Sequence, residues 1–264
     1  SWGLSAQVNG LATLWLVYGC MGGLGTGIVY IGVVGLMVKW FPQQRGFAAG
    51  VVAAGYGMGA IITTFPISLS LTTNGLEHTL TTFGILFALV GFIASQGLKL
   101  PPPAVSQPVS QTVVQSSRSF TSREMLRQPL FWLMFAMMAM MSTSGLMVTS
   151  QMAVFAEDFG ISQAVVFGMA ALPLALTIDR FTNGLTRPLF GFISDRFGRE
   201  QTMFIAFALE GVAMMLWLAC REDPLLFVLL SGVVFFGWGE IFSLFPSTLT
   251  DTFGSEHAAT NYGW

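Results

Sequence analysis

The chain has 264 residues, of which 53% are hydrophobic and only 9% are charged, and its mean hydropathy is +0.69. Soluble domains carry about 25% charged residues, so this composition excludes an ordinary cytosolic enzyme or a disordered chain and predicts a protein embedded in a lipid bilayer. The formal net charge of −2 gives no reason to expect a nucleic-acid partner. Cys20 and Cys220 both lie inside apolar runs and therefore indicate neither a disulfide framework nor a metal site.

Seven charge-poor stretches are long enough to cross a bilayer, for which a helix needs about 20 apolar residues. They are residues 10–38, 46–72, 79–98, 128–155, 162–193, 201–220 and 224–250. Glu210, Glu240 and the charges between residues 179 and 187 interrupt these stretches. Because a charge at membrane depth is costly, the fifth and seventh stretches are where we expect function.

The connections between these stretches alternate in basic content. Residues 39–45, 99–127 and 195–200 together hold eight Lys and Arg residues, whereas residues 73–78, 157–161 and 221–223 hold only Arg221. By the positive-inside rule the first set is cytoplasmic and Ser1 lies on the outer side. We expect an integral protein of the plasma membrane.

The one long connection, residues 99–127, contains PPPAVSQPVSQ and a Ser-rich run, which predicts an extended, mobile cytoplasmic linker between two helical bundles. Residues 1–98 would form part of the N-terminal bundle and residues 128–264 part of the C-terminal bundle. Three spans precede the linker and four follow it, as in a transporter of two six-helix halves that lacks helices at both ends. The chain is therefore expected to be an internal fragment that does not transport by itself.

Three pairs of glycines are spaced four residues apart in the first two spans: Gly23 and Gly27, Gly46 and Gly50, and Gly55 and Gly59. Such small residues let helices approach closely in lipid, where no hydrophobic force drives helix association. We expect all three pairs to pack against neighbouring helices.

A motif near the end of the fifth span resembles a family signature. Gly191, Asp195, Arg196, Gly198 and Arg199 fit the pattern G-x-x-x-D-R-x-G-R of the major facilitator superfamily. Residues 18–30, 39–59 and 244–263 narrow the likeness to its oxalate/formate antiporter family. This resemblance implies an all-α membrane protein with part of a 12-helix fold, about spans 4 to 10 with the end of span 3 and the start of span 11.

The signature also has a physical logic of its own. Asp195, at the end of a helix, can accept hydrogen bonds from the N-terminus of a neighbouring helix, while Arg196 and Arg199 can bind lipid phosphates. These residues would act as a latch that gates the protein. Alternatively, they are solvated loop charges that follow the positive-inside rule.

The fifth span carries its polar residues on one narrow stripe, because they recur at helical spacing. The stripe comprises Arg180, Asn183, Gly184, Arg187 and Gly191. It must face protein or water, whereas Asp179 lies about 100° away and serves a different neighbour.

Depth singles out Arg187 within this stripe. It lies 8 residues, or ~12 Å, from Asp195, and Tyr30, Tyr56 and Phe242 lie at a similar distance from the loop charges nearest to them. Trp238 is about one turn deeper. An arginine near the midplane, ringed by aromatic side chains from separate helices, predicts a site for a small carboxylate anion.

The family resemblance implies the same site. The substrate-binding arginine of the family matches Arg187, in Asn183-Gly184-Leu-Thr-Arg187-Pro188, and the aromatic ligands match Tyr30, Tyr56 and Trp238. Phe242 replaces a tyrosine of that site, Asp179 and Arg180 replace an uncharged pair, and Glu240 replaces a glycine. A partner lysine would lie just beyond Trp264.

Other interpretations of these residues stay open. Arg187 could pair with a carboxylate elsewhere, and the aromatic residues could be packing or interfacial side chains. Glu240 is either an acid that titrates during transport or a counter-ion to Arg180. The Met-rich run at 137–147 is interpreted as helix packing rather than a metal path.

The sequence thus predicts a monomeric secondary transporter that moves small carboxylates by alternating access, by exchange or by cotransport, without covalent chemistry, metal or cofactor. The resemblance places it in the inner membrane of a bacterium. Polar residues concentrated at a single depth argue against a channel. An enzyme would need a nucleophile paired with a base, and the sequence shows none. A receptor or scaffold with this fold and a proton-coupled carrier of another anion are the alternatives.

Overall fold

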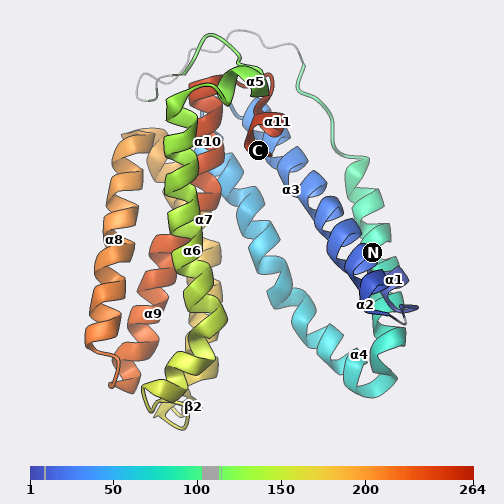
Figure 1. Ribbon diagram of the computed structural model, residues 1–264, viewed down its shortest axis with the longest axis vertical. Helices are drawn as coiled ribbons and strands as arrows, with labels where there is room; N and C mark the ends of the chain where they lie inside the picture. Colours follow the sequence, from blue (N-terminus) through green and yellow to red (C-terminus); the bar gives the residue numbers. More distant parts are fainter. Residues whose placement is uncertain (9, 103–112, 114) are drawn as a thin grey trace.

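The computed structural model describes residues 1–8, 10–102, 113 and 115–264. Its long helices form the upright elements of Figure 1. In chain order the helices are α1 (Trp2–Ser5), α2 (Leu11–Leu14), the π-helix η1 (Trp15–Met21), α3 (Gly22–Trp40), α4 (Arg45–Ser95), α5 (Ser122–Met125), α6 (Pro129–Asp158), α7 (Ala171–Phe197), α8 (Arg199–Ala219), α9 (Pro224–Trp238), α10 (Ile241–Phe253) and α11 (Ala258–Tyr262). Five helical stretches of the described residues are long and apolar enough to cross a membrane, which confirms the predicted all-α membrane fold.

The N-terminal half contains two long helical stretches, of which the first is continuous and the second is bent. α2, η1 and α3 together form the candidate span Leu11–Trp40. α4 runs over 51 residues but bends at Gly75, whose φ of 80° and ψ of 176° suit glycine and few other residues. The predicted second and third spans are therefore the two arms of α4, which descend and return in Figure 1.

The C-terminal half contains α6 to α10. Pro129 and Pro224 occupy the first turns of α6 and α9, where a proline sacrifices no helical hydrogen bond. The Asp223 side chain caps α9 by accepting hydrogen bonds from the backbone N–H groups of Leu225 and Leu226. α9 and α10 form one span, Pro224–Phe253, that is interrupted at Gly239 and Glu240.

The fifth span is shorter than predicted. Residues 165–170 form a hairpin in which β1 (Val165–Val166) pairs antiparallel with β2 (Met169–Ala170), and α7 begins only at Ala171. The turn residues Phe167 and Gly168 both have positive φ, 52° and 77°, as a tight two-residue hairpin requires. α7 is not among the five apolar candidates, because its charged residues interrupt the apolar sequence.

The prediction of an extended linker over residues 99–127 is wrong for its second part. Within the described residues, the backbone N–H groups of Ser116 and Phe120 donate to the carbonyls of Asp251 and Phe253 on α10. Residues 122–125 form α5, which Thr121 caps. Backbone pairing and a capping box therefore fix this stretch against α10, while residues 103–112 and 114 lie outside the described part.

α4 and α7 cross at their glycines. A Cβ atom on Gly46 would meet the carbonyl oxygen of Gly191, a Cβ on Gly191 would meet that of Gly46, and a Cβ on Gly50 would meet that of Arg187. The packing predicted for Gly46 and Gly50 is thus confirmed. The prediction is wrong for Gly23, Gly27, Gly55 and Gly59, because a Cβ on any of these would have nothing within 4 Å.

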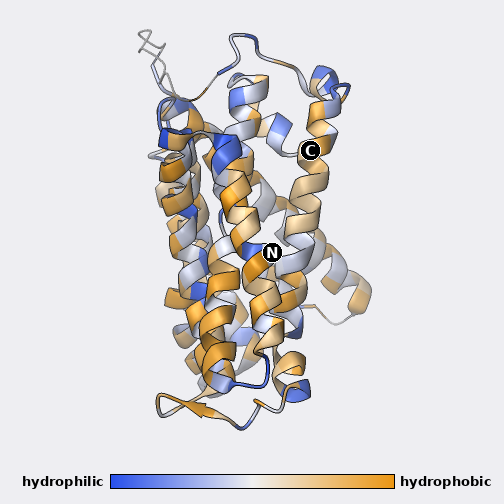
Figure 2. Ribbon diagram, turned by 90° about the vertical axis from the view of Figure 1, so that its left-hand side faces the viewer, coloured by the Kyte–Doolittle hydropathy of each residue, from blue (hydrophilic) through white to orange (hydrophobic). Residues whose placement is uncertain are grey.

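The surface of the helices is apolar over much of its length. Large side chains such as Ile62, Phe65 and Phe204 are 78%, 78% and 75% exposed. Figure 2 shows apolar colouring along the long helices and hydrophilic residues at several of their ends. Such a surface suits hydrocarbon rather than water.

Candidate functional site

Arg187 points into the protein from the middle of α7. Arg187 is 7% exposed, and its Nη1 donates to the carbonyl oxygen of Ala53 on α4 at 2.6 Å. Its Nη2 donates to Oδ1 of Asn183, one turn earlier on α7, also at 2.6 Å. The guanidinium lies against Gly57 of α4, where a Cβ would come within 3.0 Å of Nη1. Arg187 is therefore held at the crossing of the two halves.

A pocket of about 210 Å³ adjoins this guanidinium. It is lined from four helices by Gly57, Thr149, Leu176, Asp179, Arg180, Asn183, Arg187, Phe235 and Trp238. Two donors at the pocket, Nε of Arg187 and Nδ2 of Asn183, have no hydrogen-bond partner among the described residues. Buried donors without partners are rare, because each loses its hydration. The arrangement can accept an anion.

The aromatic residues predicted from depth form a chain of contacts beside Arg187. The guanidinium carbon of Arg187 lies 4.4 Å from the centre of the Phe242 ring. Phe242 contacts Trp238 edge to face, with 5.6 Å between ring centres, and the Tyr30 hydroxyl lies 3.5 Å from the Phe242 carbonyl oxygen. Tyr30 in turn lies 5.3 Å from Tyr56. The structure thus brings all five side chains together.

They do not, however, line one cavity. Trp238 lines the pocket of Arg187, whereas Tyr30 and Tyr56 line a separate hollow of about 830 Å³ in the N-terminal half. Tyr262 of α11, which the sequence reasoning missed, lies close to Tyr30 and Arg187. Tyr262 is thus a third tyrosine, beside Tyr30 and Tyr56, near the guanidinium of Arg187.

Asp179 and Arg180 lie side by side on α7 but differ in environment. Asp179 is 4% exposed, whereas Arg180 is exposed, and both line the pocket. The hydroxyl of Ser231 on α9 lies near Asp179 but donates to the carbonyl of Val228. Asp179 thus has Ser231 of α9 as a neighbour, but it also lines the same pocket as the stripe residues Asn183 and Arg187.

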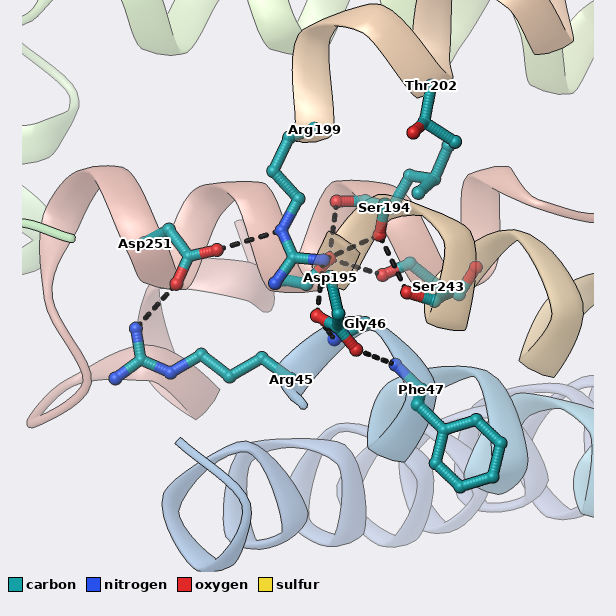
Figure 3. Close-up of polar contacts among 12 residues, drawn as sticks. Arg45, Gly46, Phe47, Ser194, Asp195, Arg199, Thr202, Ser243 and Asp251 are labelled. Carbon is teal, nitrogen blue, oxygen red and sulfur yellow. Dashed lines mark hydrogen bonds and ion pairs between the residues drawn. The ribbon is translucent and has the colours of Figure 1, made fainter. Parts of the chain in front are cut away.

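The end of α7 docks on the start of α4 through Asp195. Its Oδ1 accepts a hydrogen bond from the backbone N–H of Gly46 at 3.0 Å, and its Oδ2 accepts one from Phe47 at 2.8 Å. These are free N–H groups of the first turn of α4, which attract a negative charge. Figure 3 shows the carboxylate of Asp195 at this helix end.

Two arginines and a second aspartate extend this contact. Asp251 of α10 accepts from Nη1 of Arg45 at 2.7 Å and from Nε of Arg199 at 2.8 Å. Nη1 of Arg199 lies 2.6 Å from Oδ1 of Asp195. All four side chains are at least nine-tenths buried, and Figure 3 shows Arg199 between the two aspartates. We call Arg45, Asp195, Arg199 and Asp251 the linker-end network.

A buried network of charges between two helical halves, a signature motif that caps a helix, and a buried arginine at the crossing are all present in one chain. Residues 1–264 match the sequence profile described as Major Facilitator Superfamily. The chain belongs to this superfamily. The match covers its whole length.

Three other proteins are similar in sequence to nearly the whole chain. The chain is 32% identical to the oxalate:formate antiporter of Oxalobacter formigenes, over all of its own length and 61% of that protein. It is 29% identical to the uncharacterized MFS-type transporter YhjX of Escherichia coli K12, over 98% of the chain and 63% of that protein. It is 26% identical to an uncharacterized 38 kDa protein of Thermoproteus tenax, over 98% and 61%. The chain thus spans about three fifths of each relative.

The structure corrects one part of the superfamily signature. Arg199 was expected to bind lipid phosphates, but it is 6% exposed and pairs with two aspartates. Gly198, with φ of 97°, makes the turn between α7 and α8 that carries Arg199 back over Asp195. Arg196 is exposed and lies 4.3 Å from the Phe192 ring centre. Of the two arginines of the signature, Arg196 is therefore exposed at the surface and Arg199 is buried.

The sequence reasoning missed several residues. Arg45 and Asp251 were treated as loop charges, and their pairing joins positions 206 residues apart. Gly145 was unremarked, although a Cβ there would overlap the indole of Trp238. Gly57 lies within residues 39–59, which carry the family likeness, but its contact with Arg187 was not predicted. The motif in residues 39–59 could have pointed to Arg45 and Gly57.

Proposed function

We propose that this chain belongs to a secondary transporter for small carboxylates, with Arg187 as the principal ligand of the anion. One observation carries the proposal. Arg187 is buried at the crossing of the two halves and borders a pocket, yet it has no carboxylate partner in the part of the chain that the structure describes. The alternative that Arg187 pairs with an internal acid finds no support in these contacts.

The pocket suits a small substrate. Its volume of about 210 Å³ is below the 300–1,000 Å³ typical of sites for drug-sized ligands. The free Nε of Arg187 and the free amide of Asn183 supply directed donors, and Trp238 supplies an apolar wall. Guanidinium donors match a carboxylate in geometry as well as charge. The likeness to an oxalate:formate antiporter supports a carboxylate as the anion.

The linker-end network supports alternating access. It closes the two halves against each other at the end where α4 begins and α7 ends. If the basic loops are cytoplasmic, as the positive-inside rule predicts, the network closes the cytoplasmic side. Transport would then require these ion pairs to part while contacts on the other side form. We expect exchange of carboxylates or cotransport with an ion, and a monomer in the bacterial inner membrane.

Uptake into proteoliposomes tests this function. The native full-length protein would be reconstituted, loaded with unlabelled carboxylate, and supplied outside with radiolabelled oxalate, formate, acetate or lactate. We expect saturable uptake of at least one of them, and its loss in Arg187→Gln. No uptake above that of empty vesicles for all four anions would contradict the proposal and favour a receptor or scaffold on this fold.

A further inference from the structure

Two acidic side chains are buried in the C-terminal half at positions that the anion pocket does not use. Glu210 lies in the middle of α8 and is 2% exposed, and Glu240 lies at the interruption between α9 and α10 and is 0% exposed. Oε2 of Glu210 has no hydrogen-bond partner in the described chain, and neither oxygen of Glu240 has a partner in another residue.

The backbones of α8 and α9 nearly touch beside these two acids. A Cβ atom on Gly237 would lie 3.0 Å from the Cα of Glu210, so a larger residue there would force the helices apart. Glu240 follows Gly237 by three residues and therefore lies on the same side of the span. Glu240 therefore lies on the side of its span that faces α8 at Glu210.

Among the described residues, Glu240 has no ion pair with a cation. From α7, Thr186 and Asn183 pack against Gly239, and from α10 the Ser243 hydroxyl donates to the main-chain carbonyl of Glu240. From α8 the facing acid is Glu210, and from α6 the polar neighbour of that acid is Ser144. Both groups lack an ion pair within the described ranges.

The two α7 arginines have other surroundings. Arg180 is exposed, and Arg187 donates to Ala53 and Asn183. Arg180 is thus not the counter-ion of Glu240, and of the two interpretations that the sequence left open the structure favours a titrating acid. Two unpaired carboxylates side by side in an apolar interior would repel each other and lose their hydration. A proton on one of the two carboxyl groups would remove the repulsion and the cost of burying that charge.

Ser144 gives Glu210 a hydrogen bond in either charge state. The Ser144 hydroxyl oxygen lies 2.7 Å from Oε1 of Glu210 and 2.8 Å from the carbonyl oxygen of Met141. A hydroxyl has one proton to donate. When Glu210 is ionised, Ser144 can donate to it. When Glu210 is protonated, it can donate to Ser144, whose proton then turns to Met141.

The same carbonyl links the pair to the anion pocket. Nε1 of Trp238, which lines that pocket, donates to the Met141 carbonyl oxygen at 2.8 Å. A change in the Ser144 hydrogen bond therefore changes the hydrogen bonding of the Met141 carbonyl, which is also the acceptor for the indole N–H of Trp238. Trp238 is also two residues before Glu240 in the same interrupted span.

We infer that Glu210 and Glu240 form a proton-binding pair that takes up and releases a proton during the transport cycle, which couples carboxylate movement to protons. This inference rests on the proposed transport function. The proton would move between the aqueous phase and a carboxyl oxygen without any covalent change in the substrate. The pair identifies a proton as the coupling ion, which the anion pocket alone does not specify.

Difference infrared spectroscopy tests the pair without any transport. The native full-length protein would be titrated with acid and base in membranes, in wild type and in Glu210→Gln, Glu240→Gln and Glu222→Gln. We expect a reversible carbonyl band of a buried carboxylic acid in wild type and in Glu222→Gln, whose residue is exposed, and its loss in the other two. The same band in all four proteins would overturn the inference.

Flux measurements separate this inference from the proposed function. Carboxylate uptake would be recorded together with the internal pH of the vesicles. We expect uptake to acidify or alkalise the lumen in wild type, and Glu240→Gln to retain carboxylate exchange while its proton flux falls to background. Uptake without proton movement in wild type would overturn the proton pair but leave the carrier intact. A wild-type protein that shows the infrared band but moves no carboxylate would contradict the carrier instead.

Glu240→Asp provides a control for folding. It keeps an acid at the site and shortens the side chain by one methylene. We expect it to restore a titrating infrared band that Glu240→Gln lacks, at a shifted position. If both variants lose the band while thermal unfolding matches wild type, the acid at position 240 is not the proton carrier.

Discussion

Arg45 on α4 and Asp251 on α10 form a buried ion pair, with 2.7 Å between Nη1 and Oδ1, that joins the two halves of the chain. The same two halves meet again at the anion pocket. Asp195 of the linker-end network lies eight residues from Arg187 on α7, or ~12 Å along the helix. Under the proposed function, parting of the network would move a helix that also carries the proposed anion ligand, and closure at one end would then affect binding at midplane.

Asp251→Asn should open the linker end. Arg45 then loses its acid, while Arg199 keeps Asp195. Removing one member of a buried ion pair costs about 3–5 kcal/mol. The lower value would shift the closed-to-open ratio on the order of 100-fold.

The measurement is electron spin resonance between labels at Gln96 and Glu200, which are exposed and lie in different halves. We expect a longer distance to appear in Asp251→Asn. Glu222→Gln, at the opposite end of α8, is the matched control and should leave the distances unchanged. Identical distributions in wild type and Asp251→Asn would refute a gating role for the pair.

Gly191→Ala should weaken the crossing of α4 and α7. The added methyl group meets the carbonyl oxygen of Gly46, a backbone atom that cannot rotate away. Overpacking of this kind costs about 1–3 kcal/mol. Gly23→Ala makes a matched control, because its Cβ would have nothing within 4 Å. Thermal unfolding of the purified protein should show a lower midpoint only for Gly191→Ala, and equal midpoints would contradict the close crossing.

The buried position of Arg187 could be predicted from the sequence because it depends on local facts. Arg187 lies on a charged stripe of one helix, and its depth can be counted from Asp195. The docking of Asp195 on the start of α4 was also predictable, since a helix N-terminus is a general acceptor of negative charge. Both inferences need only helical geometry and a known order of spans.

Other features depend on contacts between distant residues and could not be derived this way. Hydropathy assigns Arg45 and Asp251 to separate connections, and only the packing of α4 against α10 brings them together. The pairing of Arg199 with the same Asp251 buries Arg199, which by position alone was expected at the lipid surface. Likewise, hydropathy counts residues 162–170 as membrane-spanning, although Gly168 and its neighbours turn the chain back as a hairpin.

The capping box before α6 should make α5 sensitive to pH. The backbone N–H and hydroxyl of Thr121 donate to Glu124, and together with Arg118 they lower the pKa of that carboxyl. Because the folded-state pKa is lowered, the stabilisation is present above the ordinary pKa of glutamate and is lost as pH falls through the lowered value.

Hydrogen exchange of the α5 amides measures this effect. Protection should fall on acidification in wild type, and should be low and independent of pH in Glu124→Gln. Glu157→Gln, far along α6, should behave as wild type. Equal protection of α5 in Glu124→Gln and wild type at neutral pH would show that the capping box does not order this segment.

The claim that Arg187 binds the substrate carboxylate is tested most directly by equilibrium binding to the purified native protein. The ligand would be whichever of oxalate, formate, acetate and lactate wild type binds most tightly. Arg187→Lys keeps the charge but loses the two-pronged geometry, and truncating one partner of a buried charge pair costs about 2 kcal/mol or more. We predict that Kd rises at least ~30-fold in Arg187→Lys and at least as much in Arg187→Gln, with Arg196→Gln, which changes an exposed arginine, unchanged. Wild-type affinity in Arg187→Gln would contradict the account and move the site elsewhere.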